Sequence, residues 1–259
     1  MLIDSHAHLE MKEFDHDREK VVERALQAGV DFVITVGTNL MLSRKAVELA
    51  EKHENIYATV GIHPHDVVKT DNKTFDNLLE LAHRKKVVAY GEIGLDFFRN
   101  ISPQEKQIDL FGRQLELAKE LQLPVIIHDR DAHEQTLKMV KASGLRRGVF
   151  HCFSGDYDMA KQCIDLGFYI SVPGVVTYDK AKTIQDIVRH VPLSSMLLET
   201  DAPYLAPIPH RGKRNEPSFI IHTAKKVAEL KSLSLEEVAQ ATTKNAKSLF
   251  HIETSGSKL

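Results

Sequence analysis

Short apolar runs alternate with amphipathic segments along the whole chain. Several of these runs are almost continuously apolar, as expected of strands that are buried on both faces of a parallel sheet. The eight predicted strands are Leu2–His6, Phe32–Gly37, Ile56–Gly61, Val87–Glu92, Pro124–His128, Gly148–His151, Phe168–Val172 and Met196–Asp201. The pattern therefore predicts a repeated strand–helix unit.

The segments between the apolar runs carry signals of helix ends. An apolar helical stripe ends at Gly29, and Gly144 and Gly167 also stand where helix C-caps belong. The sequence Ser102–Glu105 has the form of a capping box with proline at the first helical position. These signals predict helices that begin and end between successive strands.

Eight strands that alternate with helices predict an α/β fold of the (β/α)8 TIM-barrel type, formed by one domain over residues 1–259. An open doubly wound sheet is the alternative. It is disfavoured because no glycine-rich phosphate loop follows the first strand. The small polar tail Thr254–Leu259 is expected to fray.

Charge and cysteine content limit the class of protein. The 34 basic and 36 acidic residues give a net charge of −2, which argues against a protein that coats nucleic acid by bulk electrostatics. Two cysteines, Cys152 and Cys163, exclude a disulfide framework and fit a reducing cytosol. With no apolar run near the roughly 20 residues of a membrane span and no secretory pattern, we expect a cytoplasmic monomer or weak oligomer without membrane contact.

Six potential metal ligands stand at the ends of five predicted strands. The carboxyl ends of barrel strands meet at one mouth, where barrel active sites lie. A single histidine at a strand end is more often packed or solvated, but six such residues are hard to explain independently. The predicted metal ligands are His6, His8, Glu92, His128, His151 and Asp201.

This ligand set predicts a centre for two divalent ions and a hydrolytic reaction. Glu92 can bridge two cations, which together lower the pKa of a water molecule and stabilise the attacking and leaving oxygens. Imidazole suits Zn²⁺, whereas the oxygen ligands also admit Mg²⁺ or Mn²⁺. Asp201 is placed to bind metal and to accept a proton from the nucleophilic water. Glu92 and Asp201 are therefore the predicted catalytic residues.

Five further side chains are candidates for holding the substrate. His63 and His65 follow the third strand, and Arg130 follows His128 by two residues with a guanidinium that matches a phosphate or carboxylate. Arg211 and Arg214 belong to a proline-flanked cationic loop after the eighth strand. A rigid loop around His63 and a merely solvated cationic loop are the alternatives.

Two neighbours of the predicted ligands have structural interpretations. Glu199 precedes Asp201 by two residues, so it is expected on the same face as a partner that orients a ligand, with weak ligation or a structural charge as alternatives. Cys152 directly follows His151 and is expected to point to the opposite face of the strand as a small buried residue.

The motifs of the chain, taken together and in order, resemble the TatD family of metal-dependent deoxyribonucleases, within the amidohydrolase-like barrels. They are DSHAHL (Asp4 to Leu9), GIHPH (Gly61 to His65), GEIGLDF (Gly91 to Phe97), HDRDA (His128 to Ala132), HCFSG (His151 to Gly155), ETDAPYLAP (Glu199 to Pro207), RNEP (Arg214 to Pro217) and NAKSLF (Asn245 to Phe250). The resemblance implies one metal held by His6, His8, Glu92 and Asp201, and a second held by Glu92, His128 and His151.

The resemblance also implies a substrate, namely DNA that is single-stranded or frayed and is shortened from its 3′ end. An ester or amide hydrolase with the same site, such as an aminoacyl-tRNA deacylase, is the alternative, because related barrels hydrolyse all of these bonds. A metal-loaded binding protein without turnover is a third hypothesis. Asp201 beside a complete ligand set argues against that third hypothesis.

Overall fold

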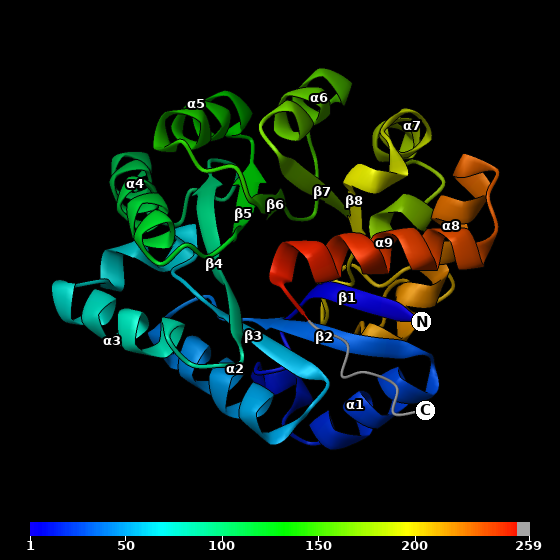
Figure 1. Cartoon of the computed structure of the whole chain (residues 1–259), viewed down its shortest axis with the longest axis horizontal. Helices are drawn as coiled ribbons and strands as arrows, with labels where there is room; N and C mark the ends of the chain where they lie inside the picture. Colours follow the sequence, from blue (N-terminus) through cyan, green and yellow to red (C-terminus); the bar gives the residue numbers. More distant parts are fainter. Residues whose placement is uncertain (253–259) are drawn as a thin grey trace.

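The computed structural model describes residues 1–252, in which strands and helices alternate from end to end (Figure 1). The strands are β1 (Leu2–Ala7), β2 (Val30–Val36), β3 (Ile56–Val60), β4 (Val87–Asp96), β5 (Val125–Arg130), β6 (Gly148–Phe150), β7 (Phe168–Val172) and β8 (Met196–Leu198). The predicted fraying of Thr254–Leu259 lies outside the described residues.

Nine α-helices follow the strands within residues 1–252. They are α1 (Arg18–Gln27), α2 (Leu40–Lys52), α3 (Asn72–Ala82), α4 (Gln104–Glu120), α5 (His133–Ser143), α6 (Tyr157–Asp165), α7 (Lys182–His190), α8 (Ile220–Lys231) and α9 (Leu235–Phe250). Short 3₁₀ helices are η1 (Lys12–Phe14), η2 (Pro64–Lys69), η3 (Gly174–Thr177), η4 (Leu193–Ser195) and η5 (Pro217–Phe219).

The eight strands form one parallel sheet in the order of the sequence, β1 to β8. The segment after β8 closes this sheet against β1. The Asp201 N–H donates to the His6 carbonyl at 2.9 Å, and the His8 N–H donates to the Ala202 carbonyl at 2.7 Å. The predicted (β/α)8 barrel is confirmed.

All eight predicted strands form, but β4 and β8 end three or more residues away from the predicted position. β4 continues to Asp96, four residues past the predicted end. β8 ends at Leu198, so Asp201 lies on the connection to β1 instead of at the end of the strand. The cause is the closure of the barrel, because Glu199 makes the last bond to β7, to the Val172 carbonyl at 3.3 Å, and the chain from Asp201 onward bonds to β1.

The strands bury both of their faces. One face packs against α1 to α8 in a large cluster that includes Ile127 and Phe150. The other face points into the barrel, where Ile126, Val149 and Leu197 form an apolar layer that continues onto the end of α9. α9 covers the amino-terminal ends of the strands, since Asn245 donates to the carbonyl of Met196 at 2.8 Å. The mouth at the other end of the barrel stays open for polar side chains.

The signals at helix ends had mixed outcomes. Gly144 and Gly167 follow α5 and α6 with φ of 72° and 88°, as predicted for helix C-termini. The predicted capping box at Ser102 is wrong. Pro103 occupies the N-cap position of α4, and the Ser102 hydroxyl donates instead to the His65 carbonyl at 3.1 Å. This tertiary contact ties the loop before α4 to the loop that carries His65.

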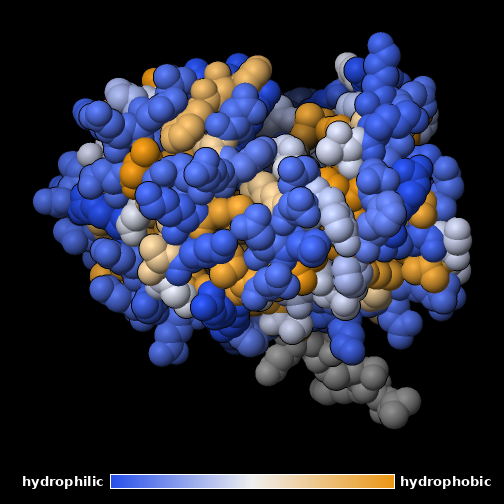
Figure 2. All heavy atoms as spheres, turned by 90° about the horizontal axis from the view of Figure 1, so that it is seen from above, coloured by the Kyte–Doolittle hydropathy of each residue, from blue (hydrophilic) through white to orange (hydrophobic). Residues whose placement is uncertain are grey.

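The outer surface agrees with a ring of amphipathic helices. Hydrophilic side chains cover most of the face shown in Figure 2, with hydrophobic atoms visible between them. Among residues 1–252, no helix combines the length and the apolar composition that a membrane crossing needs.

Gly94 of β4 provides a test of the register between β4 and β5. Its φ is +147°, and a Cβ placed there would collide with the His128 carbonyl oxygen. We expect Gly94→Ala to lower the free energy of unfolding by about 3 kcal/mol or more, because both the conformation and the space exclude a side chain. Urea unfolding followed by circular dichroism measures the change.

Gly112→Ala is the matched control. Gly112 lies within α4, where the closest neighbour of a new Cβ is the Met139 Cε at 3.6 Å. This variant should gain about 0.5–1 kcal/mol. Equal effects of the two substitutions would contradict the close approach of β4 and β5.

Candidate metal centre

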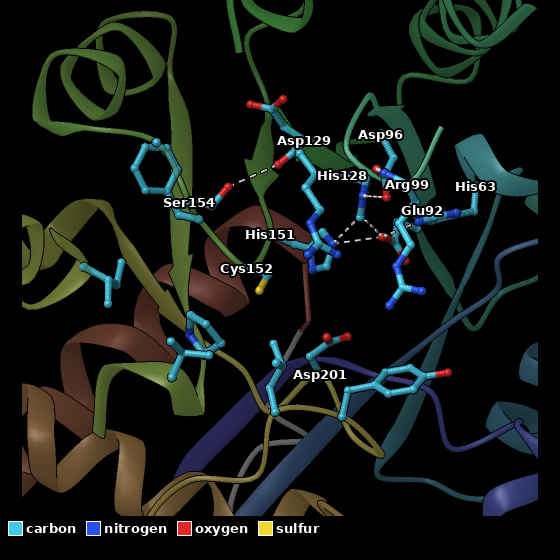
Figure 3. A pocket seen from close by; sticks show the side chains of 18 of the residues that line it. His63, Glu92, Asp96, Arg99, His128, Asp129, His151, Cys152, Ser154 and Asp201 are labelled. Atoms are coloured by element: carbon cyan, nitrogen blue, oxygen red, sulfur yellow. Dashed lines mark hydrogen bonds and ion pairs between the residues drawn. The ribbon is translucent and has the colours of Figure 1, made fainter. Parts of the chain in front are cut away.

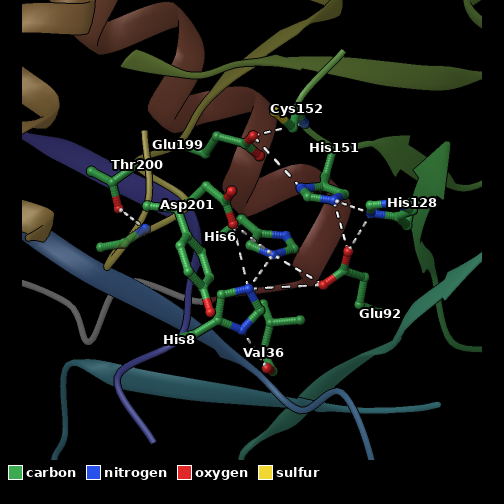
Figure 4. Close-up of polar contacts among 12 residues, drawn as sticks. His6, His8, Val36, Glu92, His128, His151, Cys152, Glu199, Thr200 and Asp201 are labelled. Carbon is green, nitrogen blue, oxygen red and sulfur yellow. Dashed lines mark hydrogen bonds and ion pairs between the residues drawn. The ribbon is translucent and has the colours of Figure 1, made fainter. Parts of the chain in front are cut away.

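The predicted metal ligands lie on the inner faces of the strands, next to the apolar core and closer to the carboxyl ends of the strands. His128 and His151 follow Ile126 and Val149 by two residues, so they point to the same interior. His6 belongs to β1 and Glu92 to β4, whereas His8 and Asp201 lie just beyond β1 and β8. The structure therefore brings all six predicted ligands together at the mouth (Figure 4).

One group of ligand atoms surrounds the Oε2 atom of Glu92. This oxygen lies 3.5 Å from His6 Nε2 and 3.8 Å from His8 Nε2. The Asp201 Oδ1 atom lies 3.7 Å from His6 Nε2 and 3.4 Å from His8 Nε2. Two imidazole nitrogens and two carboxylate oxygens thus face one point.

A second group surrounds the other oxygen of the same carboxylate. Glu92 Oε1 lies 2.8 Å from His128 Nδ1 and 2.8 Å from His151 Nε2. The His63 Nε2 atom joins this group at 3.4 Å from Glu92 Oε1. Figure 4 shows the Glu92 carboxylate between the two groups, with contacts to His6 and His8 on one side and to His128 and His151 on the other.

The distances between imidazole nitrogens within each group match the spacing of ligands around one cation. The Nε2 atoms of His6 and His8 lie 3.2 Å apart, and His128 Nδ1 lies 3.3 Å from His151 Nε2. Ligand atoms about 2.0–2.1 Å from a tetrahedral ion would be about 3.3 Å from each other. The two groups contain combinations, His6–His8–Glu92 and His63–Glu92–His128, in which the ligand atoms are close enough to hold one ion.

The protonation states of the cluster bear on metal binding. Burial alone would raise the pKa of Glu92, but His151 and His63 hold it well below its ordinary value, so the carboxylate stays ionised. Burial lowers the pKa of His63 well below its usual range, which keeps its imidazole neutral. Its Nδ1 accepts a hydrogen bond from the His65 N–H at 3.1 Å, so its Nε2 carries the proton and faces Glu92 as a donor. Ionised carboxylates and neutral imidazoles are the forms that bind metals. Against the opposing effect of burial, Asp201 raises the pKa of His8 and Glu92 raises that of His151, so an entering ion would displace a proton from each of these imidazoles.

Additional carboxylates lie beside the predicted ligands. Glu199, the predicted partner, accepts a hydrogen bond from the Cys152 N–H at 2.7 Å and lies 3.7 Å from His151 Nδ1. The Ser171 hydroxyl also donates to Glu199. Glu199 thus lies beside His151 without a hydrogen bond to its ring. The ligand atoms of His6, His151 and Glu199 are also close enough to hold one ion, so the orienting role and weak ligation both stay predictions.

Asp96 is a functional-site residue that the sequence analysis missed. Its Oδ2 atom lies 2.8 Å from His65 Nε2 and 3.4 Å from His128 Nε2. His65 therefore contacts Asp96 and not the Glu92 carboxylate. The signal was present, because Asp96 belongs to the GEIGLDF motif and follows Glu92 by four residues on a strand. It was overlooked because the predicted strand stopped at Glu92.

Asp4 fixes the segment that carries Asp201. Its carboxylate accepts hydrogen bonds from the N–H of Thr200 at 2.9 Å and from the Thr200 hydroxyl at 2.5 Å. Complete burial raises the pKa of Asp4 to about 8, although the bonds to Thr200 act in the opposite direction. Asn215 donates to the Thr200 carbonyl at 2.8 Å from the other side. The backbone next to Asp201 is thus held on both sides.

The metal centre lies in the wall of a cavity of about 830 Å³ (Figure 3). Cationic side chains also line it, namely those of Arg99, Arg130, Lys180 and Lys182. The position of Arg130 agrees with its predicted role at the substrate. Cys152 lines the cavity together with His151, so the prediction that it points away is wrong. β6 ends at Phe150 and Cys152 has a φ of 45°, which breaks the strand alternation.

Two of the arginines that were predicted to bind the substrate make their contacts outside the cavity. Arg214 forms two hydrogen bonds with Asp17, at 2.8 and 2.7 Å, and donates to the Glu13 carbonyl. Arg211 lies over the Tyr178 ring, 4.5 Å from its centre. Neither arginine lines the cavity. The sequence alone does not show that Arg214 is paired, because its acidic partner comes from a distant part of the chain.

Asp17 makes the stability of this loop depend on pH. The hydrogen bonds from Arg214 hold the pKa of Asp17 well below its usual range. The folded protein therefore gains stability that is present above the unfolded pKa of about 3.9 and is lost as the pH falls toward the folded value. We expect Asp17→Asn to lower the free energy of unfolding at pH 7 and to have a shrinking effect below about pH 4.

Denaturant unfolding at several pH values measures this effect. Asp76→Asn is the control, because Asp76 is exposed on α3 and takes part in no ion pair of residues 1–252. If the difference in the free energy of unfolding between wild type and Asp17→Asn stays constant from pH 7 to pH 3, the pair with Arg214 does not make stability depend on pH.

Comparison with known proteins agrees with this geometry. Residues 3–251 match the family model described as TatD related DNase. A Bacillus subtilis protein named uncharacterized metal-dependent hydrolase YabD is 42% identical over 254 residues, which cover 97% of this chain and 100% of the relative. An Erwinia amylovora protein named 3′-5′ ssDNA/RNA exonuclease TatD is 38% identical over 257 residues, covering 96% and 99% of the two chains.

The fold has a close counterpart among solved structures. The crystal structure of YJJV, a TatD homolog from Escherichia coli K12, superposes with a TM-score of 0.93 at 36% sequence identity. The match covers 97% of this chain and 98% of the other. The fold is therefore shared with a TatD homolog over nearly the whole length of both chains.

Proposed function

Since the chain belongs to the TatD family of metal-dependent hydrolases, we propose that it is a divalent-metal-dependent nuclease that shortens single-stranded or frayed DNA from the 3′ end. One observation carries the proposal. The Glu92 carboxylate lies between two groups of imidazoles at the wall of a cavity with cationic side chains. The exonuclease name of the Erwinia amylovora relative supports a nucleic-acid substrate.

The proposal assigns two divalent ions, of Zn²⁺, Mg²⁺ or Mn²⁺, to the two groups. His6, His8, Asp201 and Glu92 Oε2 would hold one ion. His128, His151 and Glu92 Oε1 would hold the other, with His63 beside them. When bound, such ions lower the pKa of a water molecule and stabilise negative charge on phosphoryl oxygens.

The protein side chains would position the reactants and move the proton. Asp201 is the proposed base, since its Oδ1 faces the centre and His8 beside it holds the carboxylate ionised by lowering its pKa against the opposing effect of burial. Arg130 lines the cavity next to His128 and would bind a phosphate oxygen with its planar guanidinium. His63 would orient the phosphate from the loop after β3.

A first test removes the proposed base. Asp201→Asn keeps the size of the side chain but cannot accept the proton and is a weaker ligand, so we expect the cleavage rate to fall by about 10²–10⁴-fold or below detection. The substrate is a 5′-labelled single-stranded oligonucleotide, offered to metal-stripped protein with Mg²⁺, Mn²⁺ or Zn²⁺ restored. A ladder of progressively shorter labelled strands would indicate cleavage from the 3′ end, whereas cleavage from the 5′ end would release the label at once as a mononucleotide.

Asp76→Asn serves as the matched control for the same substitution at an exposed position of α3, where activity should stay at the wild-type level. Wild-type rates in Asp201→Asn would refute the role of this base. If wild-type protein with bound metal leaves every oligonucleotide intact, ester and amide substrates, including aminoacyl esters of tRNA, become the appropriate class.

A second test counts the ions. Glu92 faces both groups, whereas His128 faces one. We therefore expect Glu92→Ala to lose both ions and His128→Ala to lose one, measured by elemental analysis of the purified proteins after dialysis. Circular dichroism confirms that each variant is folded. Loss of the same number of ions in both variants would contradict the bridging position of Glu92.

A further inference from the structure

The loop between β4 and α4 exposes two large apolar side chains beside the cavity. Phe98 is 59% exposed and Ile101 is 58% exposed. Ile101 and Arg99 of the same loop line the cavity, and in Figure 3 Arg99 lies next to Asp96 and Glu92. Exposed apolar side chains that gather at the rim of a cavity indicate a binding surface, unlike isolated ones elsewhere.

One face of the Phe98 ring is already covered by a cation. The Arg130 guanidinium carbon lies 4.0 Å from the centre of this ring. Since Arg130 is also part of the cavity wall, it fixes the orientation of the ring at the rim. Because the side chain is 59% exposed while Arg130 covers one face, we infer that the opposite face is available to a flat, apolar partner.

Cations without acidic partners lie on the other side of the mouth. Lys180 and Lys182 come from the segment after β7, three strands from β4 in the order of the barrel. Within residues 1–252, neither lysine takes part in an ion pair, and the same is true of Arg99. Their charges are free to bind an anionic ligand.

Apart from Glu92, Asp96 and Asp201 of the candidate metal centre, the acidic side chains of the cavity wall have partners of their own. Asp66 pairs with Lys69 at 2.7 Å, and Asp129 lies 2.6 Å from His133 Nδ1. Both carboxylates are thus engaged by neighbours of their own. The mouth therefore combines an exposed aromatic face, unpaired cations on the opposite wall and the metal centre between them.

We propose that these features form a binding track for single-stranded nucleic acid, in which Phe98 stacks with a base and Lys180 and Lys182 bind phosphates on the other side of the scissile bond. The inference rests on the proposed nuclease function and deepens it. Aromatic stacking together with a cationic groove is how proteins hold single strands without reading their sequence. A small amide or ester offers neither a second phosphate for the lysines nor a neighbouring base for Phe98.

Binding can be measured apart from cleavage. The probe is a ten-nucleotide oligothymidylate with a 5′ fluorescent label, titrated with Asp201→Asn protein in the presence of Mg²⁺ and followed by anisotropy. Adding Phe98→Ala should weaken binding by about tenfold with little change in its salt dependence. Adding Lys182→Gln should make the plot of log affinity against log salt shallower by about 0.7, the contribution of one phosphate contact.

Matched controls separate these effects from general surface changes. Tyr157→Ala removes an aromatic ring that is 42% exposed on α6. Lys85→Gln removes a charge just before β4, at the closed end of the barrel. Both should bind as the parent does, and Phe98→Trp should retain the affinity that Phe98→Ala loses.

The outcomes distinguish the track from the proposed activity. Binding losses at Phe98 and Lys182 support the track even if the wild-type enzyme fails to cut the strand, a result that would overturn the nuclease proposal alone. Parent-like binding by Phe98→Ala and Lys182→Gln, or no binding of the oligonucleotide by the parent, would overturn the track. If the wild type cuts the strand although these binding results overturn the track, the nuclease proposal stands without the track.

Discussion

The position of the Glu92 carboxylate is the constraint on which the rest of the site depends. Its two oxygens face different groups of imidazoles, at distances of 2.8 to 3.8 Å. A buried carboxylate is costly unless cations or hydrogen-bond donors surround it. The barrel meets this requirement by directing histidines from β1, β5 and the end of β6 toward one residue of β4. The same arrangement concentrates side chains that could hold divalent ions at the mouth.

Along the barrel axis, the residues that stabilise the fold lie in a different layer from those of the candidate metal centre. An apolar layer that includes Ile126, Val149 and Leu197 fills the interior, and α9 covers its amino-terminal end. Two residues further toward the carboxyl end of each strand, the inward-facing residues are His128, His151 and Glu199 of the candidate metal centre. Because each ligand is held by a strand or by the closure of the barrel, the loops above can change the substrate without moving the metal centre.

The fold and the ligands could be predicted because both follow from local patterns. Strand periodicity placed His128 and His151 on one inner face, and the barrel brought the strand ends together. Contacts between distant segments could not be predicted in this way. Arg214 is paired with Asp17 from the loop before α1. The alternation rule failed at Cys152, where the chain leaves β6, and the role of Asp96 depended on how far β4 extends.

The most direct measurement is an anomalous diffraction experiment on crystals of the protein soaked with Mn²⁺. The account predicts two peaks on opposite sides of the Glu92 carboxylate, one beside His6, His8 and Asp201 and the other beside His128 and His151. A single peak, or peaks away from Glu92, would contradict the assignment of this carboxylate as the bridge between two ions.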